Sequence, residues 1–161
     1  MLNKNKINCP ETYIFRGQKA ASGFISNYNF KSKLIYKPLF GSQGDNIRLI
    51  ERASDLEKLE NQTNIYYFQE YLDNSPNYDY RVLVINNNDN IKYFYMTRYG
   101  ETFINNFSKG AKCIKEKLNE DVIELAIKSS RLLNIDFCGV DIIEYKRQYY
   151  VIEVNSIPAW K

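Results

Sequence analysis

The chain has 161 residues, of which 22 are basic and 19 acidic, and this mild net charge of +3 forms no basic stripe of the kind that binds nucleic acid. There is no histidine, which excludes histidine-based acid–base catalysis and histidine metal sites. Cys9, Cys113 and Cys138 are too widely spaced for a thiolate metal motif, so any metal must bind to oxygen, as magnesium, calcium and manganese do. No stretch matches a membrane helix or a signal peptide, and we therefore expect a cytoplasmic protein.

The first half of the chain predicts short strands separated by loops. Three strands are expected, at residues 33–37, 47–51 and 65–72. Pro38 ends the first of them, and the glycine-bounded loop from Gly41 to Gly44 follows. Ser54 is the expected N-cap of a short helix, with Glu57 at the capping-box position.

The second half predicts two hairpins around one helix. The hairpin strands are expected at residues 80–85 and 91–97, and at residues 137–145 and 148–155. Residues 102–117 show no period and are expected to form a long loop. Apolar residues then recur at helical spacing, with Asn119 as the N-cap and Asn134 just beyond the C-terminal end. The whole chain predicts an α+β protein with mainly antiparallel strands.

The last hairpin carries acidic side chains inside apolar strands. Glu153 and Asn155 share one face by the strand period, and the same period assigns Val151 and Tyr149 to that face. The turn at residues 146–147 allows Asp141, on the facing strand, to share it too. Three such oxygen ligands would suit magnesium. Taken alone, the hairpin favours the simpler interpretation of two salt-bridged or half-exposed carboxylates, although burying an unpaired carboxylate is costly.

Two other segments have the composition of anion-binding sites. Lys37 ends a strand just before the Gly41–Gly44 loop, so that its ammonium group and the loop N–H groups suit a phosphate. A plain turn with an exposed lysine explains the pattern equally well. The long loop and its flank carry the donors Arg98, Asn105, Asn106 and Lys109, for which a polar surface loop is the simpler interpretation.

Taken in order, these segments resemble the RimK-like branch of the ATP-grasp superfamily. The resemblance extends from about Pro10 to Lys161 and depends on several motifs in one order rather than on any single motif. The segments that carry it are residues 37–44, 69–72, 79–84, 103–106, 126–137, 139–142 and 153–158. It implies an ATP-grasp fold with antiparallel sheets and packed helices. It also implies a carboxylate–amine ligase, in which ATP converts a carboxylate to an acyl phosphate and an amine then displaces the phosphate.

The resemblance also implies a role for individual residues. The nucleotide-binding set comprises Lys37, the covering loop Gly41, Ser42, Gln43 and Gly44, the adenine segment Gln69, Glu70, Tyr71 and Leu72, and Asp79. Asp141, Glu153 and Asn155 match the ligands of Mg²⁺, with Mn²⁺ as an alternative. Arg98 and Asn106 match catalytic donors near the transferred phosphate. Phosphoryl transfer depends on positioning and charge neutralisation, which suits a chain without histidine.

Several features depart from the family pattern. Asp45-Asn46 stands where a second glycine is usual, and Gly110-Ala111 where a glycine pair is usual. Members also carry an N-terminal α/β domain with a further nucleotide-binding lysine. We therefore expect residues 1–161 to form a partial, N-terminally truncated ATP-grasp domain, with the missing part encoded separately as one alternative. Catalysis by this chain alone is left open for that reason.

The leading hypothesis is a ligase unit that adds an amino acid, expected to be L-glutamate, to a carboxylate on a peptide or cofactor. The alternatives are a non-catalytic nucleotide-binding remnant, one half of a split ligase, and a structural domain that binds no nucleotide. The expected partners are ATP, the amino acid and the carboxylate acceptor, with no nucleic acid and no membrane.

Overall fold

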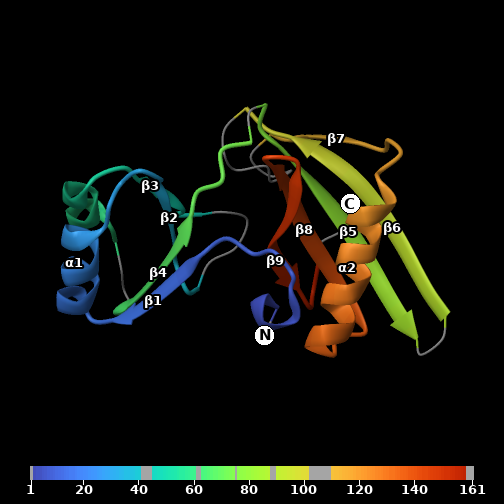
Figure 1. The fold of residues 1–161 in the computed structure, drawn as a ribbon, viewed down its shortest axis with the longest axis horizontal. Coiled ribbons are helices and arrows are strands. Elements are labelled where there is room, and N and C mark those ends of the chain that lie inside the picture. Colours follow the sequence, from blue (N-terminus) through green and yellow to red (C-terminus); the bar gives the residue numbers. More distant parts are fainter. Residues whose placement is uncertain are drawn as a thin grey trace. The chain divides into compact units, whose positions relative to one another are not determined.

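The computed structural model describes residues 2–40, 45–60, 63–74, 76–87, 90–101 and 110–158 (Figure 1). The chain divides into two compact units. Unit 1 comprises Met1–Cys9 and Asp73–Lys161, and unit 2 comprises Pro10–Leu72. Each unit contains one antiparallel sheet, so the expected α+β class is confirmed. None of the helices in the described ranges is long and apolar enough to cross a bilayer.

Unit 2 is a four-stranded sheet with the strand order β1-β4-β2-β3. Its elements are β1 (Thr12–Arg16), α1 (Gln18–Asn27), β2 (Leu34–Lys37), β3 (Arg48–Ile50), the 3₁₀ helix η2 (Ala53–Lys58) and β4 (Ile65–Glu70). Burial of apolar side chains holds it together. Leu34, Tyr36 and Phe68 of the sheet pack with Ala21 and Ile25 of α1. The strands expected at residues 33–37, 47–51 and 65–72 are confirmed, whereas β1 and α1 were not predicted.

The expected N-cap of η2 is wrong. The helix begins at Ala53, which places Ser54 inside it. The first turn is instead closed by Asp55, whose carboxylate oxygen Oδ2 accepts hydrogen bonds from the backbone N–H groups of Glu51 (3.1 Å) and Arg52 (3.2 Å). A carboxylate at the third helical position thus satisfies the N–H of the N-cap residue, Arg52, which is the part that the third residue plays in a capping box.

Unit 1 is a five-stranded sheet with the strand order β7-β6-β5-β8-β9, and α2 packs on one face of it (Figure 1). Its elements are the 3₁₀ helix η1 (Asn3–Asn5), β5 (Tyr78–Asn87), β6 (Asn90–Tyr99), β7 (Lys112–Ile114), α2 (Glu120–Leu133), β8 (Phe137–Tyr145) and β9 (Gln148–Asn155). The core under the helix joins Val122 and Ala126 of α2 to Val82, Val140 and Ile142 of the sheet.

The helix α2 and both hairpins are confirmed, although β5 and β6 extend beyond the residues 80–85 and 91–97 that were expected for the first hairpin. The Asn119 side chain accepts a hydrogen bond from the backbone N–H of Asp121 (3.0 Å), and Asn134 ends the helix with φ of 54°. An asparagine tolerates that left-handed conformation better than most residues. The loop expected over residues 102–117 is wrong in part, because Lys112–Ile114 pairs with β6 as β7. Residues 102–109 lie outside the described ranges.

A β-bulge in β9 corrects one further expectation. Asp141 pairs with Glu153, but the next residue of β8, Ile142, pairs with Val151, so that Ile152 is an extra residue in β9. One extra residue inverts the alternation of side chains along a strand. Val151 therefore packs in the core with Ile142, and Tyr149 packs against that core, whereas Glu153 lies on the opposite face with Asp141. The assignment of Val151 and Tyr149 to the face of Glu153 was wrong.

Candidate functional site

The sheet face of unit 1 that is turned away from α2 carries a row of charged side chains on neighbouring strands. The strand register places these side chains next to one another. Asp79 of β5 pairs with Arg98 of β6, and Arg81 of β5 pairs with Asp141 of β8. Asp141 also pairs with Glu153 of β9. Asn155 pairs with Gly139, one step along the same face. These residues alternate along their strands with core residues such as Val82, Val140 and Ile142.

Four of these side chains form a buried ionic network. Arg81 makes a bidentate pair with Asp141, from Nε to Oδ1 and from Nη2 to Oδ2, both at 2.8 Å. Arg98 makes a second bidentate pair with Asp79 at 2.6 Å and 2.8 Å, and its Nη2 also lies 3.0 Å from Oδ2 of Asp141. Asp79, Arg98 and Asp141 are each less than 5% exposed. Buried charges require such partners, because an unpaired one would be strongly destabilising.

The two carboxyl groups of the network differ in electrostatic environment. Burial acts to raise the pKa of Asp141, but hydrogen bonds from Arg81 and the charge of Arg98 outweigh it and lower the pKa below its ordinary value. Burial raises the pKa of Asp79 to about 7, and the negative charge of Asp141 acts in the same direction, although the charge and hydrogen bonds of Arg98 act to lower it. The paired carboxylates also raise the pKa of Arg98 against the effect of its burial, so its charge is fixed.

The donor set on this face fits magnesium by its chemistry. Asp141, Glu153 and Asn155 offer two carboxylates and one amide oxygen, which are hard ligands of the kind that magnesium takes. Glu153 is exposed and forms no ion pair within the described ranges, so its carboxylate is accessible. Asp141 is more constrained, because both of its oxygens already accept hydrogen bonds from arginine. Oδ1 accepts from Arg81 alone and keeps a second lone pair for a metal ion, whereas Oδ2 already lies close to Nη2 of both Arg81 and Arg98.

Of the two expected catalytic donors, Arg98 and Asn106, only Arg98 lies within the described residues. Arg98 is 3% exposed, and its Nε and Nη2 atoms are engaged by Asp79 and Asp141. Asn106 lies outside the described residues, as does the whole loop Gly41–Gly44. Arg81 was not assigned a role from the sequence. Its signal was available, since it follows Asp79 by two positions in an apolar strand and so shares its face.

In unit 2, two of the expected nucleotide-binding residues contact each other. The Lys37 ammonium group donates a hydrogen bond to Oε1 of Gln69 (2.6 Å), and Nε2 of Gln69 donates to Oγ1 of Thr12 (3.3 Å). Gln69 is buried, so this chain of contacts fixes the position of a half-buried lysine at the end of β2.

The expected adenine segment follows directly in the chain. The backbone N–H groups of Glu70 and Tyr71 donate to the carbonyl oxygens of Glu11 (2.8 Å) and Lys33 (2.9 Å), and Leu72 is buried. The segment is therefore tied to both neighbouring parts of unit 2 and held in one conformation.

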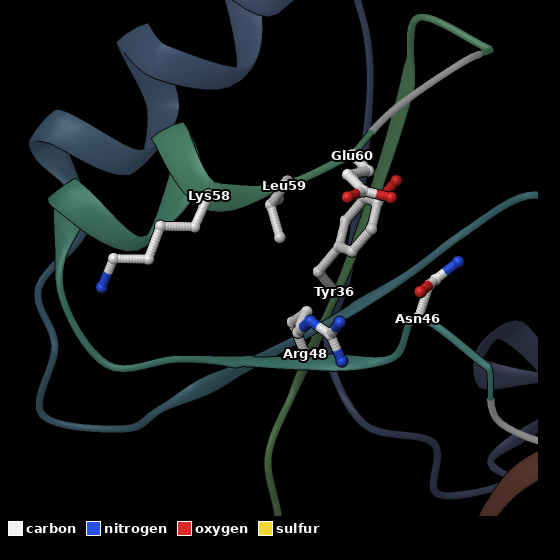
Figure 2. A pocket seen from close by; sticks show the side chains of 6 residues that line it. All are labelled: Tyr36, Asn46, Arg48, Lys58, Leu59 and Glu60. Atoms are coloured by element: carbon white, nitrogen blue, oxygen red, sulfur yellow. The ribbon is translucent and has the colours of Figure 1, made fainter.

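A small cavity in unit 2 lies apart from the expected site residues. It has a volume of ≈ 30 Å³ and is lined by Tyr36, Asn46, Arg48, Lys58, Leu59 and Glu60. Figure 2 shows the Lys58 side chain extending away from Tyr36. A space of this size holds about one water molecule. It is too small for a nucleotide, and it contains none of the residues expected to bind one.

Comparison with known proteins agrees with the α+β fold described above. A model of the RimK-like ATP-grasp domain matches residues 1–161. The coenzyme gamma-F420-2:alpha-L-glutamate ligase of Methanocaldococcus jannaschii is 31% identical, over 100% of this chain and 57% of its own length. The alpha-aminoadipate–LysW ligase LysX of Saccharolobus solfataricus is 30% identical, over 100% of this chain and 60% of its own. The tetrahydromethanopterin:alpha-L-glutamate ligase of M. jannaschii is 27% identical, over 99% and 56%.

Solved structures show the same fold. The ATP-grasp ligase PsnB, complexed with a minimal precursor, Mg and ADP, has a TM-score of 0.66 at 21% identity, covering 99% of this chain and 48% of its own. The ADP complex of N5-carboxyaminoimidazole ribonucleotide synthetase has a TM-score of 0.73 at 13% identity, covering 98% and 43%. The chain thus spans little more than half the length of these curated relatives. With its α+β fold and the family match over its whole length, the chain belongs to the RimK-like ATP-grasp family.

Proposed function

We propose that the chain is the ATP-grasp unit of a carboxylate–amine ligase that consumes ATP and adds L-glutamate to a carboxylate. The observation that carries the proposal is the pairing of Asp141 with Glu153 on the charged face, one step from Asn155 and beside two arginines. This combination suits a divalent metal with phosphate, because the arginines limit the negative charge that the carboxylates concentrate.

Each residue of the charged face has a distinct part in this proposal. Glu153 would bind the metal through its exposed carboxylate and Asn155 through its amide oxygen, and Asp141 would contribute an oxygen whose position is fixed by Arg81 and Arg98. Magnesium, or manganese as an alternative, supplies neutralisation of phosphate charge when bound. Arg98 acts here by orienting Asp141, which modifies the expectation that it contacts the transferred phosphate.

Lys37 is proposed to bind a nucleotide phosphate through its ammonium group. The hydrogen bond to Gln69 holds the lysine at the end of β2, so little side-chain entropy is lost when an anion binds. Gly41, Ser42, Gln43 and Gly44 remain proposed as the covering loop. Asn106 remains proposed as a donor near the acyl phosphate.

Glutamate is proposed as the amine because two of the relatives are named as alpha-L-glutamate ligases. A peptide or cofactor carboxylate is proposed as the acceptor. Relatives are named for coenzyme F420, tetrahydromethanopterin and LysW, and PsnB was solved with a precursor. In the reaction, the terminal phosphoryl group of ATP passes to the acceptor carboxylate, and the amine then displaces phosphate to form the amide.

The test is ADP release and amide formation with Mg-ATP, glutamate and a panel of peptide and cofactor carboxylates, read by a coupled assay and mass spectrometry. Glu153→Gln is expected to abolish turnover, because it removes a metal-binding charge. Glu124→Gln is the matched control, since Glu124 is exposed on α2 and belongs to the same unit. No turnover, even when an N-terminal α/β domain from a relative is supplied separately, would refute the ligase proposal.

A non-catalytic nucleotide-binding unit, or one half of a split ligase, is the second candidate. The burial of Arg98 favours it, because that guanidinium group is engaged by carboxylates rather than presented to a phosphate. This candidate predicts that Mg-ATP raises the melting temperature without any ADP release by the chain alone. Turnover that appears only with an added N-terminal domain would identify the split ligase.

A further inference from the structure

The outer edge of β6 is incompletely paired. β7 pairs only with Thr97–Tyr99, so no strand in the described ranges pairs with the outer side of Asn90–Met96. Figure 1 shows this edge, with the short β7 beside one end of β6. Half of the backbone N–H and C=O groups of an edge strand point away from the sheet. Such a row can pair with another extended chain.

A groove lies along this edge. It has a volume of ≈ 430 Å³ and is lined by Tyr93, Phe94, Tyr95, Met96, Cys113 and Lys115. Phe94 is 53% exposed and Tyr93 is 44% exposed, which are large values for aromatic side chains. The rings of Tyr93 and Tyr95 lie nearly parallel, with their centroids 6.4 Å apart.

Apolar surface is available on both sides of this edge. Tyr93 and Tyr95 pair with Val84 and Val82 and therefore lie on the α2 side of the sheet. Phe94 pairs with Leu83 and lies on the opposite side. An added strand projects its side chains alternately to the two sides, and here each side offers an aromatic contact.

The charge at the edge is positive. Lys92 and Lys115 are exposed, and neither forms an ion pair with any residue that the structure describes. The exposed Lys112 and Lys117 add to this charge, while Glu116 accepts a hydrogen bond from the Tyr99 hydroxyl (2.8 Å). Lysine on an edge strand disfavours pairing between two copies of a chain, because each copy brings the same charge. An acidic chain would instead be complementary.

We propose that the edge Asn90–Met96 of β6 is a docking surface for an acidic peptide segment, which adds to the five-stranded sheet as an extended strand. Backbone hydrogen bonds to β6 align the segment, the aromatic groove receives its alternate side chains, and Lys92 and Lys115 attract its carboxylates. The inference uses none of the nucleotide-binding residues, so it stands whether or not the chain is a ligase.

The first measurement is fluorescence anisotropy with a labelled peptide of alternating valine and glutamate. Saturable binding is expected, and it should be lost when alternate peptide nitrogens are methylated or when lysine replaces glutamate. Reversing both charges with Lys92→Glu and Lys115→Glu should weaken binding about tenfold, from the usual strength of exposed ion pairs. The matched control reverses the exposed Lys4 and Lys128 instead, and it should bind as the unmodified chain does.

Hydrogen exchange with the same peptide locates the contact. The outward-pointing amides within Asn90–Met96 should be protected by the peptide, whereas the amides of α2 should exchange unchanged. The proposal is overturned by an absence of saturable binding, equal binding of the methylated peptide, equal binding to the double charge reversal, or protection elsewhere. It is also overturned if sedimentation shows a dimer whose interface is this edge, because a second copy would then be the occupant.

Discussion

Removing Arg98 should strongly destabilise unit 1. The change Arg98→Met keeps much of the side-chain volume but removes a guanidinium group that bridges Asp79 and Asp141 within the buried network. Asp141 keeps its bidentate pair with Arg81, whereas Asp79 loses its partner while it stays 4% exposed. The cost therefore comes chiefly from one carboxylate left buried and unpaired.

The magnitude follows from this arrangement. Breaking a buried pair by removing one partner costs about 3–5 kcal/mol, which is a large part of the stability of a small domain. The cost should be smaller at pH 5 than at pH 8, because Asp79 can then take up a proton and remain buried as a neutral group. Adding Asp79→Asn to Arg98→Met should recover part of the loss at pH 8, because it removes the unpaired charge.

Urea unfolding followed by circular dichroism at pH 5 and pH 8 measures these differences. Arg131→Met is the matched control, since Arg131 is exposed in the last turn of α2, and its effect should stay within about 0.5 kcal/mol. A loss below about 1 kcal/mol for Arg98→Met at pH 8 would contradict the reasoning. So would additive effects of the two substitutions, because residues in one buried network should be coupled.

Three further predictions concern single positions. The pKa of Asp79 in the folded state is raised to about 7. The protonated side chain therefore adds to the free energy of unfolding at low pH, and this contribution is lost as the pH rises towards 7. Asp79→Asn should remove this pH dependence in urea titrations between pH 4 and pH 8. Gly139→Ala should destabilise by about 1–3 kcal/mol in the same assay, because the added Cβ would lie 2.8 Å from Cβ of Pro158; an unchanged midpoint would show that Pro158 moves freely. Asn119→Ala should cost about 1 kcal/mol through loss of the cap to Asp121, whereas Asn119→Asp should cost little; equal losses would argue against a capping role.

Long elements with a strong pattern were predictable from the sequence. The helix from Glu120 to Leu133 has apolar residues at helical spacing and asparagines at both ends, and the hairpin over residues 137–155 has two apolar runs around a charged turn. The elements that were missed are short or weakly patterned. The helix α1 begins after Gly17 without a side-chain cap and contains Gly23, and β7 has three residues. Tertiary contacts rather than local preference hold these elements.

The contacts of the charged face that depend on pairing between strands distant in the sequence could not be predicted. That Asp141 and Glu153 lie in one hairpin was evident from the sequence, but their pairing depends on the bulge, because a regular register from the turn would set Glu153 opposite Val140. The partnership of Asp141 with Arg81 and Arg98 joins strands about 40–60 residues apart, as their numbering shows, and no local pattern specifies it. The bulge at Ile152 was equally hidden, since an isoleucine between Val151 and Glu153 continues an ordinary apolar run.

That extra residue in β9 has a consequence for how the chain tolerates length changes. Among the four residues of β9 before Ile152, the odd-numbered side chains face α2. Among the three residues after it, the even-numbered side chain faces α2. Deleting Ile152 would make Val151 and Glu153 neighbours, and ordinary alternation would then keep Val151 beneath α2 and Glu153 on the charged face. A gap of one residue in an alignment at this point would therefore leave the core side and the polar side of the strand unchanged, whereas a gap at Val154 would exchange them for the residues beyond it. Removal of Ile152 should therefore be tolerated more readily than removal of Val154, because only the second change turns the residues beyond it to the other face.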